Sequence, residues 1–285
     1  MDASNLPLFL SAVLPAFGYL IFIYLMGRKL VNWKSAIVYL MFGILSISIL
    51  EYGIHFVFPT ITEYFFTNQN APIYNLVSMK TVYPKTIYSI LFLCFVQVAL
   101  KEELTKMAAF FLAGIPRRHK TKEKKDSLFA IMFYSCCVAV GFAIIENIHY
   151  AQQWLQKESW ESTQNMLIQR SVFAVLSHMI AGLLMGYGLA MSSISKGINK
   201  VFFLVVPTLM AILYHGYYNF LFMTSNSSDF IELGIIKIHV HASIMMAFSL
   251  FITFLLGASL KKYSLRHNKV LRKKEKQALV TKNTP

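Results

Sequence analysis

The fold is decided by residues 86–115, which read TIYSILFLCFVQVALKEELTKMAAFFLAGI. The stretch is apolar and longer than the ~20 residues that a membrane-spanning helix needs, yet it contains Lys101, Glu102, Glu103 and Lys106. Each ionised group at bilayer depth costs roughly 2.5–3.5 kcal/mol, so charged groups inside a span point by default to a functional site. Glu102 and Lys106 are four residues apart and share a helix face, whereas Glu103 points about 100° away. We therefore expect a functional site inside the membrane.

The rest of the chain has the composition of a polytopic membrane protein. Its 285 residues are 56% hydrophobic and 14% charged, with a mean hydropathy of +0.53, which excludes an ordinary soluble domain. We predict an all-α membrane bundle of about seven transmembrane helices, forming one domain at 1–260 with a basic tail at 261–285. Apolar runs long enough to span lie near residues 8–26, 36–58, 86–114, 128–150, 170–195, 201–223 and 233–260.

The net charge of +14 indicates membrane topology and not a nucleic-acid partner, because most basic residues alternate by loop. Basic residues cluster after the predicted first, third, fifth and seventh spans: Arg28, Lys29, Lys34, Arg117, Arg118, Lys120, Lys122, Lys124, Lys125, Lys196, Lys200 and nine in the tail. Lysine and arginine accumulate on the cytoplasmic side of membrane proteins. We therefore place the N-terminus outside and the C-terminus in the cytoplasm, where the tail also attracts anionic lipid head groups.

Three further polar groups interrupt the predicted spans that follow. Glu146 and Asn147 lie in GFAIIENIHY, His178 lies in RSVFAVLSHMIAGLLMGYG, and His215 shares a helix face with Asn219 in ILYHGYYNF. Each group alone can be structural: a lone membrane histidine is more often a packing residue. Because they recur on successive helices, which a bundle can bring to one cavity, we expect a shared polar site. Gly182 and Gly186 follow His178 on the same face and permit close approach of another helix.

This inventory of side chains supports the activation of water. A carboxylate can act as general base, imidazoles can bind a metal or stabilise an oxyanion, and an amide can hold a carbonyl. Hydrolysis is thus the reaction that we predict. The alternative from another class is a proton-coupled transporter or channel, since buried Glu, Lys and His also form proton relays. A non-catalytic scaffold is the third alternative, and it would need no acid pair.

The segments KEELTK, GFAIIEN, RSVFAVLSH and HGYYN, in this order on consecutive predicted helices, resemble the PrsW family of intramembrane proteases. That family belongs to the wider group of Abi proteins and CAAX prenyl endopeptidases. The resemblance covers roughly residues 86–223 and implies peptide-bond cleavage at a bacterial plasma membrane. It implies Glu102 and Glu103 as the catalytic acid pair with His178 and His215 beside them, and it matches Glu146, Asn147 and Asn219 to motif positions.

Two mechanisms are compatible with the sequence. In the first, His178, His215 and one or two of Glu102, Glu103 and Glu146 bind Zn²⁺, with His178, His215 and Glu146 as the ligand set that we favour. In the second, no metal is bound: a glutamate deprotonates water, while His178, His215 and Asn219 stabilise the oxyanion. The sequence leaves both open.

The expected substrate is a membrane protein cut near the outer side of the bilayer. The predicted helix ends place His178 and His215 about 12 Å from the outer boundary. The family resemblance suggests a single-span signalling protein, such as an anti-sigma factor, as the substrate class. We leave three groups of residues out of the site: Glu51 with His55, His239 with His241, and the cysteines Cys94, Cys136 and Cys137.

Overall fold

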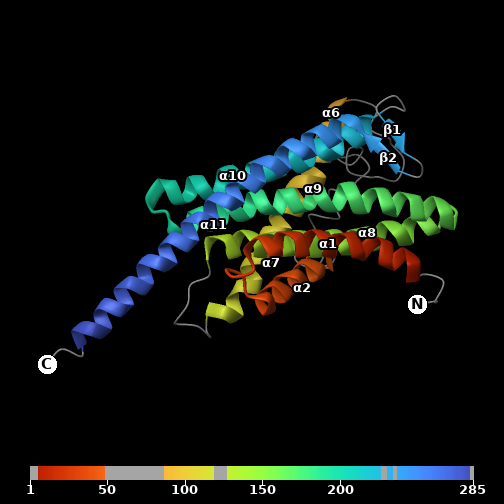
Figure 1. Ribbon diagram of the computed structural model, residues 1–285. Coiled ribbons are helices and arrows are strands. Elements are labelled where there is room, and N and C mark those ends of the chain that lie inside the picture. Colours follow the sequence, from red (N-terminus) through yellow and green to blue (C-terminus); the bar gives the residue numbers. More distant parts are fainter. Residues whose placement is uncertain (1–5, 49–86, 119–126, 226–229, 234–235, 283–285) are drawn as a thin grey trace.

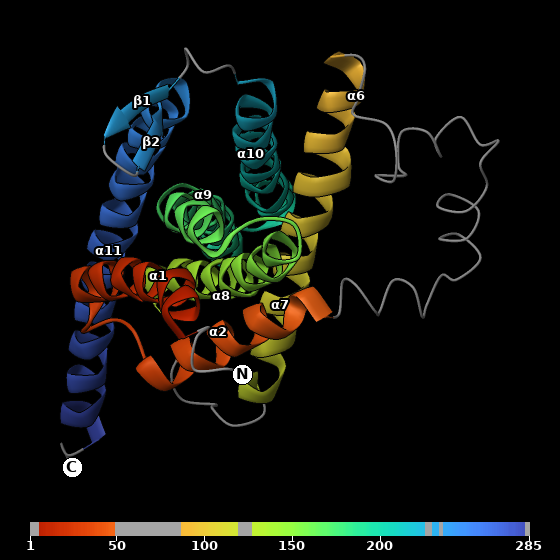
Figure 2. The ribbon, with the colours of Figure 1, turned by 90° about the vertical axis from the view of Figure 1, so that its right-hand side faces the viewer.

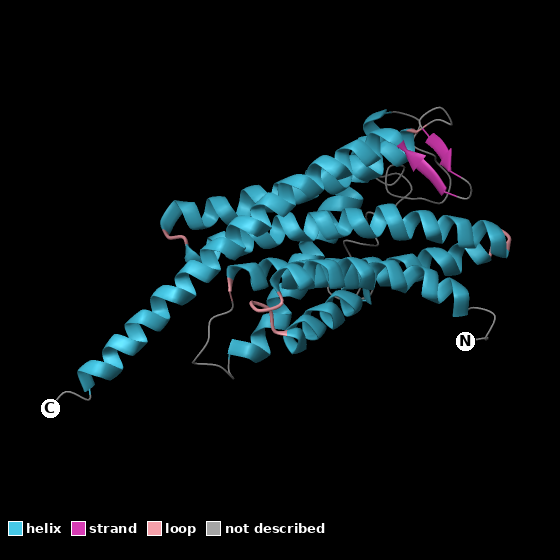
Figure 3. Ribbon diagram, in the orientation of Figure 1, coloured by secondary structure: helices cyan, strands magenta, loops and turns pink. Residues whose placement is uncertain are grey.

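The computed structural model describes residues 6–48, 87–118, 127–225, 230–233 and 236–282, and these residues form a helical bundle with one short hairpin (Figures 1 and 3). Because α6, the π-helix η3 and α7 follow one another without a break, the described residues hold seven helical segments. The elements are α1 (Leu6–Gly27), α2 (Trp33–Ser48), α6 (Ile87–Phe92), η3 (Leu93–Leu100), α7 (Lys101–Arg118), α8 (Leu128–Leu155), α9 (Trp160–Ile194), α10 (Gly197–Thr224), β1 (Phe230–Leu233), β2 (Ile236–His239) and α11 (Val240–Lys282).

The predicted class of helical membrane protein is confirmed. Five described helices, α1, α8, α9, α10 and α11, are long and apolar enough to cross a membrane. Helix α2 is apolar but shorter, and the remainder of the predicted span at 36–58, with Glu51 and His55, lies outside the described residues. A total of seven transmembrane helices therefore stays a prediction.

Helices α8 and α9 form the buried centre of the bundle, with the other helices packed around them (Figure 2). The two helices touch closely where α9 carries glycine. A Cβ added to Gly182 would lie 2.5 Å from the Cβ of Ala139, and one added to Gly186 would lie 2.8 Å from the backbone of Met132. The expectation that the glycines permit close approach of another helix is thus confirmed, and the partner is α8.

Helix α9 begins at Trp160, ten residues before the predicted start at 170. The Ser159 side chain caps it by accepting a hydrogen bond from the Ser162 amide at 3.2 Å. The predicted boundary was wrong because the first turns are polar and therefore lower the local hydropathy. Arg170 consequently lies about 15 Å inside the helix and not at its end.

The predicted span at 233–260 is also corrected, because its first residues belong to a β-hairpin. Strands β1 and β2 pair antiparallel, with Phe230 opposite His239 and Leu233 opposite Ile236. The segment IIKIHV at 235–240 is rich in β-branched residues, which favour strands. Helix α11 starts only at Val240 and continues to Lys282.

The predicted span at 86–114 is helical, but its middle is the π-helix η3, immediately before KEELTK. Such π-helical turns are rare and occur frequently at functional sites. Here η3 packs against α10 beside His215, since a Cβ added to Gly216 would lie 2.5 Å from the Phe95 ring. This contact brings the acid-bearing α7 and the histidine-bearing α10 together.

Candidate active site

The ammonium group of Lys106 lies at the centre of a buried polar cluster. Its Nζ lies 2.7 Å from Glu103 Oε1, 3.5 Å from Glu102 Oε2 and 2.7 Å from His178 Nδ1. The side chain is fully buried and its Nζ lies 4.3 Å from the centre of the Phe142 ring. From the sequence we expected Glu102 to share a helix face with Lys106 and Glu103 to point away. That expectation is corrected, because Glu103 is the nearer partner of Lys106. Because an ammonium group only donates hydrogen bonds, Nδ1 of His178 accepts.

Each of the two histidines is oriented by its own carboxylate. Nε2–H of His178 donates to Glu146 Oε2 at 2.8 Å, and Nδ1–H of His215 donates to Glu103 Oε1 at 2.7 Å. The two imidazole rings lie edge to face with their centres 4.7 Å apart. The predicted residues of α7, α8, α9 and α10 are therefore brought together in one cluster.

Glu102, His178 and His215 could together hold a metal ion. One donor atom from each lies within 4.8 Å of the others, and all three residues are buried. Among the described residues, they are the one such group of histidine, cysteine and acidic side chains. Two imidazoles with a carboxylate are a known set of zinc ligands. A metal-bound histidine almost always donates its other N–H to a partner such as a carboxylate, as both histidines do here, so the residues fit Zn²⁺ once Lys106 Nζ, which lies 2.7 Å from His178 Nδ1, releases that atom.

Arg170 belongs to this cluster, although the sequence analysis did not place it in the site. Its guanidinium group lies 3.0 Å from Glu146 Oε2 and donates from Nε to Asn147 Oδ1 at 2.9 Å. It also stacks 3.6 Å from the centre of the Tyr150 ring. A basic residue two turns before a membrane histidine could have indicated that Arg170 belongs to the site. We missed this signal because we predicted that the helix starts at residue 170.

The comparisons with known proteins identify the family. Residues 32–256 match the family described as PrsW family intramembrane metalloprotease. The chain belongs to this family. The resemblance drawn from the four motifs is thereby confirmed, and the alternative of a proton-coupled transporter or channel gains no support.

Two relatives named Protease PrsW align with part of the chain. The protein from Clostridioides difficile (strain 630) is 31% identical over 135 residues, which cover 47% of this chain and 53% of the relative. The protein from Oceanobacillus iheyensis (strain DSM 14371) is 33% identical over 133 residues, covering 47% and 55%. The chain thus spans about half the length of these PrsW proteins that it matches. No solved structure matches.

Within this PrsW family member, the two predicted amides differ in burial and in their contact with the cluster. Asn147 is fully buried and is bound to Arg170. Asn219 is only half-buried, and no hydrogen bond among the described residues links it to the cluster. His239, which we left out of the site, is buried elsewhere, where its ring Nε2 contacts the Leu221 carbonyl at 3.2 Å.

Proposed function

We propose that this protein is an intramembrane endopeptidase that hydrolyses a peptide bond of a membrane-protein substrate. One observation carries the proposal: Glu102, His178 and His215 converge from three helices, and each histidine is held by a second carboxylate. Family membership supports the same activity. No observation favours the transporter alternative, and a scaffold would not need this buried group of charges.

We assign Glu102, His178 and His215 as the residues that hold Zn²⁺, with Glu102 in the place that we had predicted for Glu146. When bound, Zn²⁺ polarises a carbonyl and activates water. Glu103 is suited to act as the base, since its Oε2 is buried and has no hydrogen-bond partner among the described residues. The Lys106 ammonium beside it can stabilise negative charge that develops on the substrate.

The protein is expected to lie in a bacterial plasma membrane with the site nearer the outer side. The α8–α9 turn and the N-terminus lie at one end of the bundle, and the basic loop after α1 and the C-terminus lie at the other (Figure 1). His178 lies 18 residues after Trp160, about 27 Å along α9, so its predicted depth of about 12 Å does not hold. Glu146 is nine residues before Leu155 and His215 is nine before Thr224, so both lie about 14 Å from the first end. This depth favours cleavage near the outer boundary of a single-span protein, for which an anti-sigma factor is our candidate class.

The activity is tested with the purified full chain and a model single-span substrate. We expect Glu102→Gln, Glu103→Gln, His178→Ala and His215→Ala each to lower cleavage by about 10²-fold or more, because each removes a group that holds or deprotonates the water. Glu161→Gln, at the exposed start of α9, is the matched control and should cleave normally. Normal cleavage by both glutamine variants of the acid pair would show that the proposed function is wrong.

The role of the metal is tested separately. A strong chelator should abolish cleavage, added Zn²⁺ should restore it, and the reconstituted protein should hold about one zinc per chain. The variants Glu102→Gln and His215→Ala should lose that zinc. Full turnover by protein free of metal would instead favour the second mechanism, in which a glutamate alone deprotonates water.

A further inference from the structure

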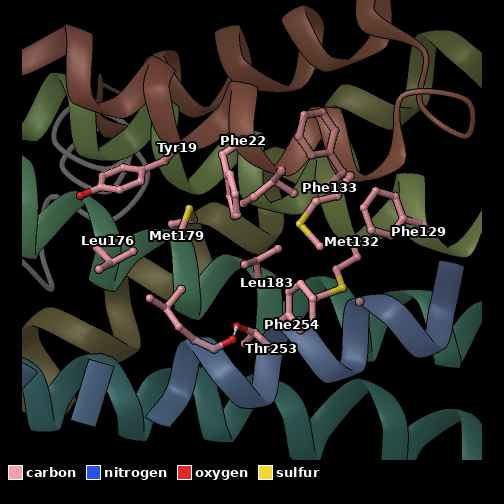
Figure 4. Close-up of a pocket in the computed structure, with 14 residues that line it drawn as sticks. Tyr19, Phe22, Phe129, Met132, Phe133, Leu176, Met179, Leu183, Thr253 and Phe254 are labelled. Carbon is pink, nitrogen blue, oxygen red and sulfur yellow. Dashed lines mark hydrogen bonds between the residues drawn. The ribbon is translucent and has the colours of Figure 1, made fainter. Parts of the chain in front are cut away.

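An apolar cavity of about 310 Å³ lies between α1, α8, α9 and α11 (Figure 4). None of its lining residues belongs to the candidate active site. Only Tyr19 and Thr253 in the lining carry a hydroxyl or charged group, and both hydroxyls donate to backbone carbonyls, those of Val172 and Ser249. The cavity thus offers no free polar group to a ligand, and its volume is within the range of small-ligand pockets.

The cavity opens sideways between α1 and α11. Phe22 and Phe254, one on each helix, are 64% and 51% exposed while they line the cavity. Since α1 and α11 are long and apolar enough to span the bilayer, this opening faces lipid acyl chains. A transmembrane helix with its side chains is about 10 Å across, so we take a slimmer acyl chain as the occupant.

Basic residues surround one end of the cavity. Met26 and Gly257 line that end, and Lys261 donates a hydrogen bond to the Met26 carbonyl. Arg28 and Lys29 follow Met26 by two and three residues and are exposed, as is Lys262. Clusters of basic residues at the cytoplasmic surface attract anionic lipid head groups. On the topology inferred above, this end of the cavity lies in the cytoplasmic leaflet.

We propose that this cavity binds an acyl chain of an anionic phospholipid from the cytoplasmic leaflet, with the lipid phosphate at Arg28, Lys29 and Lys262. The chain enters between Phe22 and Phe254, and the cavity excludes water from it. The apolar lining sets the affinity and the basic end sets the preference for anionic lipid. This site does not depend on the proposed peptidase activity, so its test needs no cleavage assay.

Lipid retention by the purified full chain tests the site. Native mass spectrometry compares phosphatidylglycerol with phosphatidylcholine of the same acyl chains, and we expect the anionic lipid to be retained preferentially. The double variant Arg28→Gln/Lys29→Gln should bind phosphatidylglycerol about 30-fold more weakly, from about 1 kcal/mol per basic residue. Lys196→Gln/Lys200→Gln removes the same charge from the exposed start of α10 and should leave binding unchanged.

A glycine pair tests the cavity itself. Gly257 lines the cavity, and an added Cβ would lie 3.8 Å from Met132 and Phe129, so the Cβ of Gly257→Leu fits and the rest of its side chain fills cavity space. This variant should lose retention of both lipids, whereas Gly18→Leu, at an open position on α1, should retain them. The double variant Arg28→Gln/Lys29→Gln changes only exposed side chains, so we expect it to fold normally. It therefore still tests the lipid site if Gly257→Leu folds poorly.

Three results would overturn the proposal. Equal retention of the two lipids by the wild-type protein would exclude the anionic head-group site. Retention by Gly257→Leu at the wild-type level would exclude the cavity as the place of the acyl chain. Retention of phosphatidylglycerol by Arg28→Gln/Lys29→Gln at the wild-type level would exclude Arg28 and Lys29 as the place of the lipid phosphate.

Discussion

Replacing Glu146 with Gln removes one negative charge from the site and keeps its shape. The Glu146 carboxylate accepts a hydrogen bond from His178 Nε2–H at 2.8 Å and pairs with Arg170 at 3.0 Å. It thereby keeps the lone pair of His178 on Nδ1, which lies 2.7 Å from Lys106 Nζ and 4.0 Å from Glu102 Oε2. Loss of such a carboxylate partner typically lowers metal affinity or activity 10–100-fold. We expect Glu146→Gln to weaken Zn²⁺ binding by this factor, or about 1.4–2.7 kcal/mol.

Zinc affinity is measured by competition with a chromophoric chelator, beside kcat and KM for a model substrate. We expect kcat to fall together with zinc affinity while KM changes little, because Glu146 orients His178 and contacts no substrate. Glu161→Gln makes the same chemical change at an exposed position and should alter neither quantity. If Glu146→Gln binds zinc as tightly as the wild-type protein, the assignment of Glu146 as the residue that orients His178 is refuted.

Three further predictions concern packing, charge and topology. Gly186→Ala should lower the free energy of unfolding by about 1–3 kcal/mol, seen as a lower thermal unfolding midpoint, because its Cβ would lie 2.8 Å from the Met132 backbone. Gly18→Ala is the control, and equal midpoints would contradict the close α8–α9 contact. Lys106→Met should destabilise the protein by about 3–5 kcal/mol, since it leaves the fully buried Glu103 without the ammonium group that it pairs with. An unchanged thermal unfolding midpoint would argue against the Lys106–Glu103 ion pair. In a background without native cysteines, a membrane-impermeant thiol reagent added outside should label cysteine at exposed Ser159 but not at exposed Lys196; the reverse order would invert the topology.

The sequence alone determined the class of protein and predicted most residues of the candidate site. Hydropathy is a local property, so apolar runs identify α8 and α10 to within a few residues. Charges inside a span are costly, so Glu102 and Glu103 stand out without any structure. The four motifs in fixed order also gave the family, which the match over residues 32–256 confirms.

Boundaries were less predictable where polar residues or β-branched residues mark the ends of helices. The polar first turns of α9 hid ten residues of that helix, and with them the position of Arg170. The hairpin before α11 and the π-helix before KEELTK were not predicted. Both depend on how the chain packs, since short segments have weak preferences of their own.

Only the tertiary structure decided which carboxylate pairs with Lys106 and with each histidine. Within α7, Glu102 and Glu103 stand four and three residues from Lys106, and both spacings allow an ion pair, so the sequence could not choose between them. The choice follows from how far each helix is rotated and how closely it approaches its neighbour. The contacts of Gly186 with Met132 and of Gly216 with Phe95 set that approach. They join residues far apart in the chain, and for that reason the pairs His215–Glu103 and His178–Glu146 exist only in the folded bundle.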